Sequence, residues 1–306
     1  MMDNLLHEFK DAWQRPNNAL PQIIIINVVV FLVLVILNLF GNIDALSGIN
    51  SFVQRQFSIP SQFSEFIFRP WTIITYAFSH SLNGIMHILF NMLFLYWFGK
   101  LIVEYLGNQK LINIYVLGAI TGATLYLLAY NIVPGLTDHR ATMVGASGAV
   151  YAVVLAAATL IPNYTFFLLF FGPVKIKYIA LFVLATSLIG LNGPNIGGNL
   201  AHLGGGFIGV FYIKQLQSGT DWAAWIDSIM RFFMSFFVRQ PKMKVSSQKK
   251  TRASSTSSYS GGNQSTANNI ADQAEIDKIL DKISQSGYES LSKEEKQKLF
   301  NASKKG

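Results

Sequence analysis

A few polar residues stand inside otherwise apolar stretches of the sequence, and their chemistry needs an explanation. They are His87, Asn91, Ser147 and His202. A serine hydroxyl becomes a nucleophile when a neutral histidine accepts its proton, and that histidine can later return the proton to a leaving amine. Polar side chains inside a bilayer are costly, so they are often functional. These residue types predict a nucleophile–base pair of Ser147 and His202, provided that the fold brings their segments together.

A pair of this kind also needs hydrogen-bond donors for the oxyanion of a tetrahedral intermediate. Backbone N–H groups at the start of a helix around Ser147 could supply them. The side chains of His87 and Asn91 could add more, because residues four apart share one helix face. Gly145 and Gly148 flank the serine and would let backbone and substrate approach closely. The pattern therefore predicts a site for acyl transfer.

Each residue also has an ordinary structural explanation. A serine in a membrane helix often bonds to its own helix backbone, and the glycines after His202 are typical of close helix packing, Gly205 and Gly209 above all. We expect ordinary interfacial or loop roles for His7, His80 and His139, although His80 could support the site from behind. No metal or cofactor is predicted, because the spacing of His87 and Asn91 lacks the second histidine and the carboxylate of the metalloprotease pattern.

The composition narrows the class of protein. Of the 306 residues, 51% are hydrophobic and 13% are charged, whereas a soluble domain carries about 25% charged residues. There is no cysteine, which excludes a disulfide scaffold and thiolate zinc sites. Most of the formal net charge of +8 comes from the segment after residue 238. The sequence is therefore typical of a nearly neutral membrane body followed by a basic tail.

Several apolar stretches approach the roughly 20 residues that cross a bilayer core of about 30 Å. They are residues 23–40, 85–103, 111–130, 147–161, 178–191 and 200–216. The last three are short and rich in Gly, Ala and Ser, which favours helices buried among other helices. We expect the first to be a retained helix rather than a cleaved signal peptide, because its apolar run is long and no small-residue cleavage site follows. The fold class predicted is an all-α membrane protein with six transmembrane helices.

Basic residues flanking these stretches predict the orientation, because cytoplasmic loops are enriched in Lys and Arg. An N-terminus on the inside places the larger basic group there, namely Lys10, Arg15, Lys100, Lys110, Lys175, Lys177 and Lys214. The outer loops then carry Arg55, Arg69 and Arg140. Both termini are expected to be cytoplasmic, in a bacterial cytoplasmic membrane. His87, Asn91, Ser147 and His202 would then lie at similar depth in the outer part of the membrane.

The remaining segments are expected to be accessory. We predict a cytoplasmic segment over residues 1–20, a membrane domain over 21–217, an interfacial amphipathic segment over 218–240, a flexible linker over 241–270 and a helical hairpin over 271–306. The long apolar loop at 41–84 is also expected to lie in the membrane interface, since a structureless loop of this length is uncommon. Within the hairpin, Ser292 and Glu295 form a capping-box pattern at the start of a helix.

These motifs resemble those of the rhomboid family of intramembrane serine proteases. Gly145-Ala-Ser147-Gly148 matches the GxSG motif of that family, His87 to Asn91 matches HxxxN, and Ala201 to Gly205 matches AHxxG. Further matches are Arg69-Pro70-Trp71, Glu104 and Gly107. The resemblance covers about residues 20–217. Two departures are Thr72, where many bacterial members have arginine after the tryptophan, and an expected length difference between His80 and His87.

The resemblance implies a catalytic dyad without an acidic third member, in a six-helix bundle that needs no cofactor. By motif position, Ser147 is the nucleophile and His202 the base. The N–H of Ser147 with the side chains of His87 and Asn91 would form the oxyanion hole, and Tyr151 would pack on the imidazole. Members of the family cut transmembrane proteins near the outer membrane face, and the substrate reaches the site beside the fifth helix.

Two other functions are compatible with a polytopic membrane protein. A catalytically inactive rhomboid-like protein that binds membrane clients would usually lack the serine or the histidine, and this chain has both. A transporter or channel would favour an internal repeat or charged residues along a pore, and we see neither in the sequence. The expected partners are therefore transmembrane protein substrates and the lipid bilayer, with no nucleic acid.

Overall fold

The chain divides after Gln240 into two compact units. In the computed structural model, the residues described are 18–41, 44–82, 84–168, 171–237, 277–279, 281–283 and 290–303. The predicted linker at 241–270 and most of the predicted N-terminal segment at 1–20 lie outside these ranges. The first unit holds all the residues that the sequence singles out for chemistry.

Each of the six apolar stretches predicted to cross the membrane forms a helix in the first unit. The helices are α2 (Ala19–Phe40), α6 (Ile85–Leu106), α7 (Asn108–Ile132), α8 (Ser147–Leu160), α9 (Ile176–Ile189) and α10 (Ile196–Gln217). Among the described residues, α2, α6, α7 and α10 are long and apolar enough to cross a membrane. Helices α8 and α9 have 14 residues each, about 21 Å at 1.5 Å per residue. The structure therefore supports four spans directly, and a sixfold crossing stays a prediction.

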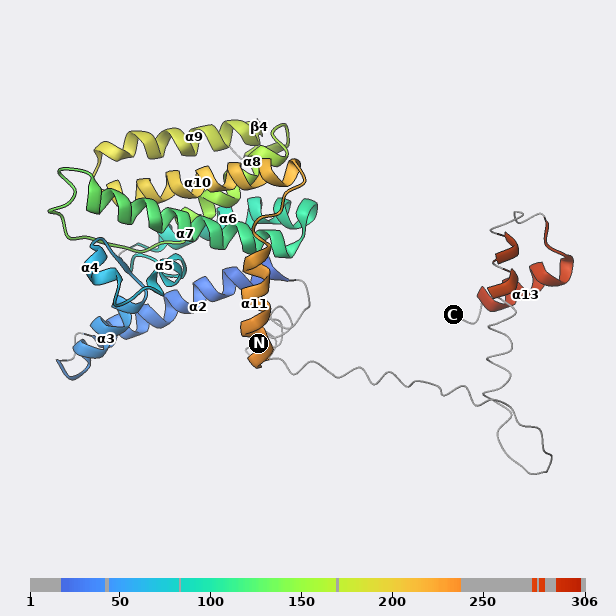
Figure 1. The fold of residues 1–306 in the computed structure, drawn as a ribbon, viewed down its shortest axis with the longest axis horizontal. Helices are drawn as coiled ribbons and strands as arrows, with labels where there is room; N and C mark the ends of the chain where they lie inside the picture. The colour runs from blue at the N-terminus through green and yellow to red at the C-terminus, as the bar shows by residue number, and fades with distance from the viewer. Residues whose placement is uncertain are drawn as a thin grey trace, which may run out of the picture. The chain divides into compact units, whose positions relative to one another are not determined.

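Helix α8 lies at the centre of the bundle and packs on α6, α7 and α10 (Figure 1). Most of its residues are buried, as its Gly- and Ala-rich sequence predicts. Helix α9 lies at one edge of the bundle (Figure 1), and there the expectation of burial among other helices is wrong. It exposes Leu181, Phe182, Leu188 and Ile189, because its outward face carries large apolar side chains rather than small ones.

The contact between α8 and α10 depends on glycine. A Cβ atom at Gly205 would overlap the carbonyl oxygen of Gly148, and one at Gly209 would overlap the carbonyl oxygen of Ala152. The two helix backbones therefore touch without intervening side chains, as the small-residue spacing predicts. This approach brings the start of α8 next to the first half of α10.

We predict that Gly205→Ala lowers the stability of the bundle by about 1–3 kcal/mol, because overpacking forces the two backbones apart. Gly206→Ala is the matched control. A Cβ at Gly206 would meet Leu155 at 3.4 Å, an ordinary van der Waals distance. Thermal unfolding in detergent, followed by circular dichroism, should show a lower Tm for Gly205→Ala and no loss for Gly206→Ala. Equal Tm values would contradict the close-packing account.

The segment between α2 and α6 is structured rather than a free loop. It contains α3 (Asp44–Gln56), β1 (Ile59–Pro60), α4 (Phe63–Phe66), α5 (Thr72–Thr75) and the 3-10 helix η1 (Tyr76–Phe78). Strand β1 pairs antiparallel with β2 (Thr142–Met143), in the register Ile59 with Met143 and Pro60 with Thr142. A further bond runs from Ser61 N to Ala141 O at 2.9 Å. These bonds tie the segment to the chain that leads into α8.

The motif Arg69-Pro70-Trp71 connects parts of this segment through hydrogen bonds. The guanidinium of Arg69 donates to the carbonyl oxygen of Arg55 at 2.9 Å and contacts Glu65 at 3.4 Å. The indole N–H of Trp71 donates to Gln56 at 3.2 Å. These bonds connect the end of α3 to α4 and α5, so the motif fixes the shape of the segment.

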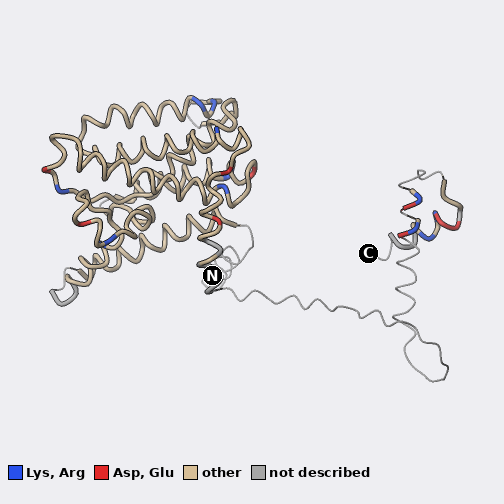
Figure 2. The backbone as a smooth tube through the Cα atoms, in the orientation of Figure 1, with Lys and Arg blue, Asp and Glu red and all other residues tan. Residues whose placement is uncertain are grey.

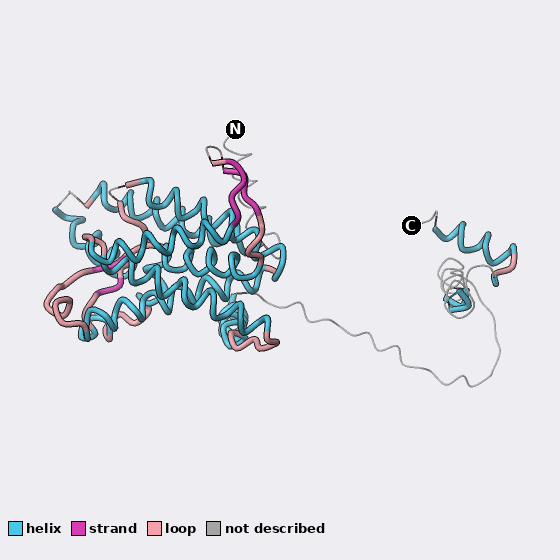
Figure 3. The backbone as a smooth tube through the Cα atoms, turned by 90° about the horizontal axis from the view of Figure 1, so that it is seen from above, coloured by secondary structure: helices cyan, strands magenta, loops and turns pink. Residues whose placement is uncertain are grey.

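A second short ladder joins α8 to α9. Strands β3 (Thr165–Leu168) and β4 (Gly172–Lys175) pair antiparallel. Seen from above, the two ladders lie at opposite ends of the helix bundle (Figure 3). Lys and Arg also gather at the two ends and are almost absent between them (Figure 2). An apolar belt bounded by charged ends is the pattern expected of helices that cross a bilayer.

Helix α11 (Ala224–Phe237) follows the bundle. Its Asp227 accepts a hydrogen bond from Gln109 at 2.8 Å, and Asp221 just before it forms an ion pair with Lys110. Both contacts attach the helix to the start of α7. The predicted amphipathic segment thus contains a helix over Ala224–Phe237, and its place in the membrane interface stays a prediction.

The second unit contains α13 (Lys293–Ser303). Residues 277–279 and 281–283 are also helical. The predicted capping box is confirmed, because Ser292 N donates to Glu295 at 2.7 Å and Glu295 N donates to Ser292 Oγ at 3.2 Å. Glu295 also binds Lys282. The hairpin as a whole stays a prediction.

Candidate active site

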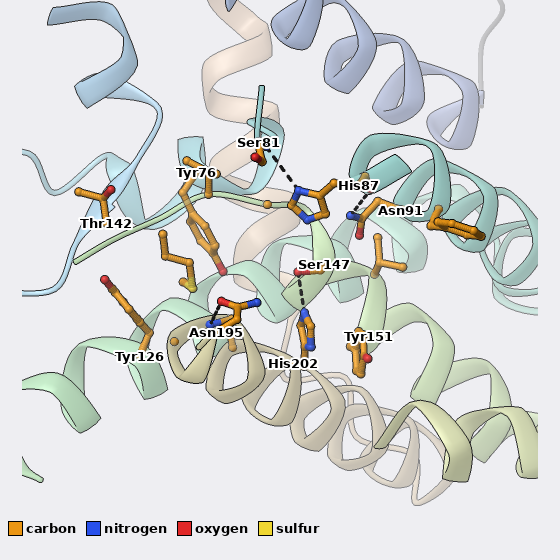
Figure 4. Close-up of a pocket in the computed structure, with 18 of the residues that line it drawn as sticks. Tyr76, Ser81, His87, Asn91, Tyr126, Thr142, Ser147, Tyr151, Asn195 and His202 are labelled. Carbon is orange, nitrogen blue, oxygen red and sulfur yellow. Dashed lines mark hydrogen bonds between the residues drawn. The ribbon is translucent and has the colours of Figure 1, made fainter. Parts of the chain in front are cut away.

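Ser147 and His202 lie in direct contact, although 55 residues separate them in the chain. The hydroxyl oxygen of Ser147 is 2.8 Å from Nε2 of His202 (Figure 4). Ser147 is the first residue of α8, and His202 lies in the second turn of α10. The close approach of these two helices therefore creates the pair. At this distance the imidazole can accept the hydroxyl proton.

The turn before Ser147 is held by a glycine in an unusual conformation. Gly145 has a φ of 139°, in a region that residues with a side chain rarely adopt. Its N–H donates to the carbonyl oxygen of Tyr76 at 3.0 Å. Tyr76 is itself 1% exposed and donates its hydroxyl to Ala119 at 2.8 Å. The turn thus directs Ser147 into the site while α8 begins with its first N–H groups free of intrahelical partners.

His202 is held from several sides. The ring of Tyr151 stacks on the imidazole, with centroids 4.1 Å apart and planes inclined by 9°. The start of α10 is capped by Asn195, whose side chain accepts from Gly198 N at 3.2 Å. The stacking agrees with the position that the family resemblance gives to Tyr151. Together these contacts fix the orientation of the imidazole beside Ser147.

The other nitrogen of His202 also has a partner. Its Nδ1 is 3.1 Å from the hydroxyl oxygen of Ser187 on α9. No motif in the sequence indicates this residue, and the family resemblance implies a site of only two members. A serine 15 residues before the histidine, across the turn between α9 and α10, carries no signal in a single sequence.

His87 and Asn91 face the same cavity as the pair. Nδ1 of His87 accepts from Ser81 N at 3.4 Å, so the ring proton lies on Nε2. A Cβ atom at Gly145 would be 3.3 Å from that Nε2 and 3.4 Å from Ser147 Oγ. His87 therefore presents an N–H donor beside the serine. Asn91 donates one amide N–H to the carbonyl oxygen of His87 at 2.8 Å, which leaves it a second N–H.

The cavity has a volume of about 750 Å³ and is lined by all the predicted site residues named so far except Gly148. Gly148 lies just behind it, where a Cβ would be 3.2 Å from the carbonyl oxygen of Ala201. The lining combines the nucleophile Ser147, the base His202 and the N–H donors of the His87 and Asn91 side chains with apolar walls (Figure 4). Within the described residues, no group of three metal-binding side chains comes together. The arrangement suits nucleophilic attack on a carbonyl.

His80 is not an ordinary loop histidine. It is 2% exposed, and its ring meets that of His87 edge-on, with centroids 5.2 Å apart. Burial, with a smaller contribution from His87, lowers the pKa of His80 to about 3. It is therefore neutral at neutral pH and packs behind His87, which agrees with the alternative supporting role. His139 is exposed, as expected of a loop residue, and His7 lies outside the described residues.

We predict that Gly145→Ala slows the reaction of Ser147 with a fluorophosphonate by about tenfold or more, because a small displacement of a reacting group is costly. A Cβ there would be 3.2 Å from the His87 ring. The strained φ should also lower stability by about 1–3 kcal/mol. Labelling rate and Tm in detergent measure the two effects.

Gly135→Ala is the matched control for this prediction. Gly135 has a φ of 86°, and among the described residues no atom lies within 4 Å of where its Cβ would stand. It should share the loss of stability and keep the labelling rate. Equal labelling of the two variants would contradict the role given to the turn.

Comparison with known proteins adds to this geometry. A family model described as Rhomboid domain matches residues 68–218, a range that contains His87, Asn91, Ser147 and His202. A second, described as Family of unknown function (DUF6576), matches residues 264–305. Helix α2 lies outside both matches, although the resemblance seen in the sequence extends to it.

Curated relatives come from Arabidopsis thaliana. RHOMBOID-like protein 12, mitochondrial, is 33% identical over 160 residues, which cover 48% of this chain and 47% of that protein. Rhomboid-like protein 16, chloroplastic, is 29% identical over 183 residues and 56% of each chain. The chain thus spans about half the length of the curated relatives it matches. Their names place them in organelles and so do not support the expected bacterial membrane.

Proposed function

This chain belongs to the rhomboid family through residues 68–218, and on that premise we propose that it is an intramembrane serine endopeptidase. One observation carries the proposal. Ser147 Oγ and His202 Nε2 are 2.8 Å apart in a cavity between helices of a membrane bundle. A nucleophile and a base that are held together between membrane helices can act on a carbonyl group within the membrane region. The substrates are transmembrane proteins.

The reaction proceeds through an acyl-enzyme. Nε2 of His202 accepts the proton of Ser147 as the hydroxyl oxygen attacks the scissile carbonyl carbon. The oxyanion that forms is stabilised by the N–H of Ser147 and the side chains of His87 and Asn91. The imidazolium then donates its proton to the leaving amine as the C–N bond breaks. A water molecule, deprotonated by His202, attacks the ester, and collapse of the second intermediate releases the acid and restores Ser147.

We infer that the site opens toward the outer side of the membrane. The β1–β2 ladder and the starts of α6, α8 and α10 mark one end of the bundle. Lys100 near the end of α6, Lys110 near the start of α7 and Lys175 just before α9 mark the other. The rule for basic flanks puts the second end in the cytoplasm. Helices α8 and α9 then complete six crossings, both termini lie inside, and cleavage falls near the outer face.

We further infer that the substrate approaches beside α9. An apolar groove of about 380 Å³ separates α9 from α6. Phe94, Trp97 and Phe98 of α6 line one side, and Tyr178, Ile179 and Phe182 of α9 line the other. The lining of the groove is almost entirely apolar, so its side chains can move apart without breaking polar contacts. Val183 and Phe94 line both this groove and the cavity that holds Ser147, so the two spaces adjoin.

We predict that Ser147→Ala and His202→Ala each abolish cleavage, because each removes half of the nucleophile–base pair. Purified proteins in proteoliposomes would be incubated with a generic transmembrane substrate, and cuts would be mapped by mass spectrometry. His139→Ala, a change at an exposed loop histidine, should cleave like the wild type. Near-normal turnover by a folded Ser147→Ala or His202→Ala protein would overturn the proposal.

A fluorophosphonate probe separates a wrong substrate from an inactive site. Labelling that requires both Ser147 and His202, without cleavage, would mean that the site is active and the substrate unsuitable. A folded wild-type protein that neither cleaves the substrate nor reacts with the probe would instead favour the alternative function, that of an inactive rhomboid-like protein that binds membrane clients.

We predict that Asn91→Ala reduces kcat by about 10²–10³-fold without abolishing cleavage, the usual effect of removing one oxyanion donor. Asn91 also bonds to the carbonyl oxygen of His87, so Tm must be measured in parallel to show that the fold survives. A rate within twofold of the wild type, with an unchanged Tm, would exclude Asn91 from the oxyanion hole.

A further inference from the structure

We propose that Ser187 is a third member of the site, a positioning residue that accepts a hydrogen bond from Nδ1–H of His202. It thereby holds the imidazole in the tautomer whose Nε2 can accept the proton of Ser147. This inference rests on the proposed function, and it adds a residue that neither the motifs nor the family resemblance supplies.

The geometry around Ser187 is closely defined. The residue is 1% exposed, and its hydroxyl oxygen is 3.1 Å from Nδ1 of His202, 3.1 Å from the hydroxyl oxygen of Tyr151 and 3.2 Å from the carbonyl oxygen of Val183. The Tyr151 hydroxyl is also 3.2 Å from that carbonyl. Side chains from α8, α9 and α10 thus meet in one buried hydrogen-bonded cluster.

The cluster has a preferred direction of donation. The carbonyl oxygen of Val183 can only accept, so Tyr151 donates its one hydroxyl proton to it. Ser187 has two acceptors for its own proton, the hydroxyl oxygen of Tyr151 and the carbonyl oxygen of Val183. In either case the lone pairs of Ser187 Oγ remain available to Nδ1–H of His202. The opposite arrangement, with Ser187 donating to Nδ1, would place the ring proton on Nε2 and prevent it from accepting the proton of Ser147.

Protonation of His202 strengthens this contact. When the imidazole takes the proton of Ser147, Nδ1–H becomes part of a cation, and hydrogen bonds to ionised groups are about twice as strong as neutral ones. Ser187 therefore stabilises the intermediate more than the resting state, as a catalytic contribution requires. A neutral hydroxyl also avoids the desolvation penalty that a carboxylate would carry in this buried position.

A purely structural role for Ser187 is the alternative to be tested. Serine in a membrane helix often bonds to the carbonyl four residues earlier, and Ser187 makes that contact with Val183. Thr186 provides the matched control on the same helix. Its hydroxyl donates to the same carbonyl oxygen at 2.8 Å, but Thr186 itself is exposed.

The experiment compares Ser187→Thr with Ser187→Val, two variants of the same shape that differ in the hydroxyl. For each purified protein, kcat and KM would be measured with a cleaved transmembrane substrate, alongside the rate of fluorophosphonate labelling of Ser147 and the Tm. We expect Ser187→Val to lose about tenfold in kcat and in labelling rate, the effect of one ordinary hydrogen bond. KM should stay within about threefold. Ser187→Thr should recover most of the rate, and Thr186→Val should match the wild type.

The outcomes separate this inference from the function on which it rests. Equal kcat and labelling rates for Ser187→Thr and Ser187→Val, in a wild-type background that reacts, would overturn the role of Ser187 and leave the protease intact. If the added methyl group unfolds both variants, Ser187→Ala decides, because labelling at the wild-type rate would equally overturn the role. A folded wild-type protein without any labelling would overturn the proposed function and this inference with it.

Discussion

The contact between the backbones of α8 and α10 is the constraint on which the rest of the site depends. A serine hydroxyl and an imidazole reach only a few ångströms from their own helices. They can meet at 2.8 Å only because Gly205 and Gly209 let the two helices touch. In a membrane, where lipid is as apolar as leucine, such close packing is itself a main source of helix association. The same glycines therefore serve the stability of the bundle and the geometry of the site.

The nucleophile and the base of the site belong to one series of hydrogen-bonded side chains. Ser147 meets His202, His202 meets Ser187, and Ser187 meets Tyr151 and the α9 backbone. Buried polar clusters of this kind specify one arrangement strongly, because an unpaired donor or acceptor in a low-dielectric interior is costly. Since the members come from α8, α9 and α10, the orientation of the imidazole depends on the edge helix α9 as well as on the central pair.

The segment between α2 and α6 acts on the site from the end of the bundle where α6, α8 and α10 begin. The β1–β2 ladder and the carbonyl of Tyr76 hold the chain that leads into Ser147, while Ser81 and His80 hold His87 from the other side. The buried pair of Tyr115 and Asn27 anchors this segment to α7 and α2, because Tyr115 donates to Ala77 at 2.6 Å and Asn27 donates to Tyr115 at 3.2 Å. The turn before the nucleophile is therefore set by contacts far from it in sequence.

The sequence by itself determined the six apolar helices of the bundle and the positions of the polar residues along them, and its short motifs indicated the rhomboid family, because hydrophobic runs and short motifs are local patterns. The small-residue spacing of Gly205 and Gly209 and the capping box at Ser292 were also predictable, because each pattern spans only a few residues of the chain. Only the tertiary structure decided that α9 lies at an exposed edge, that His80 packs behind His87, and that Ser187 reaches Nδ1 of His202. These depend on how separate helices are rotated and placed against one another, and a single sequence holds no local record of a contact between side chains on different helices.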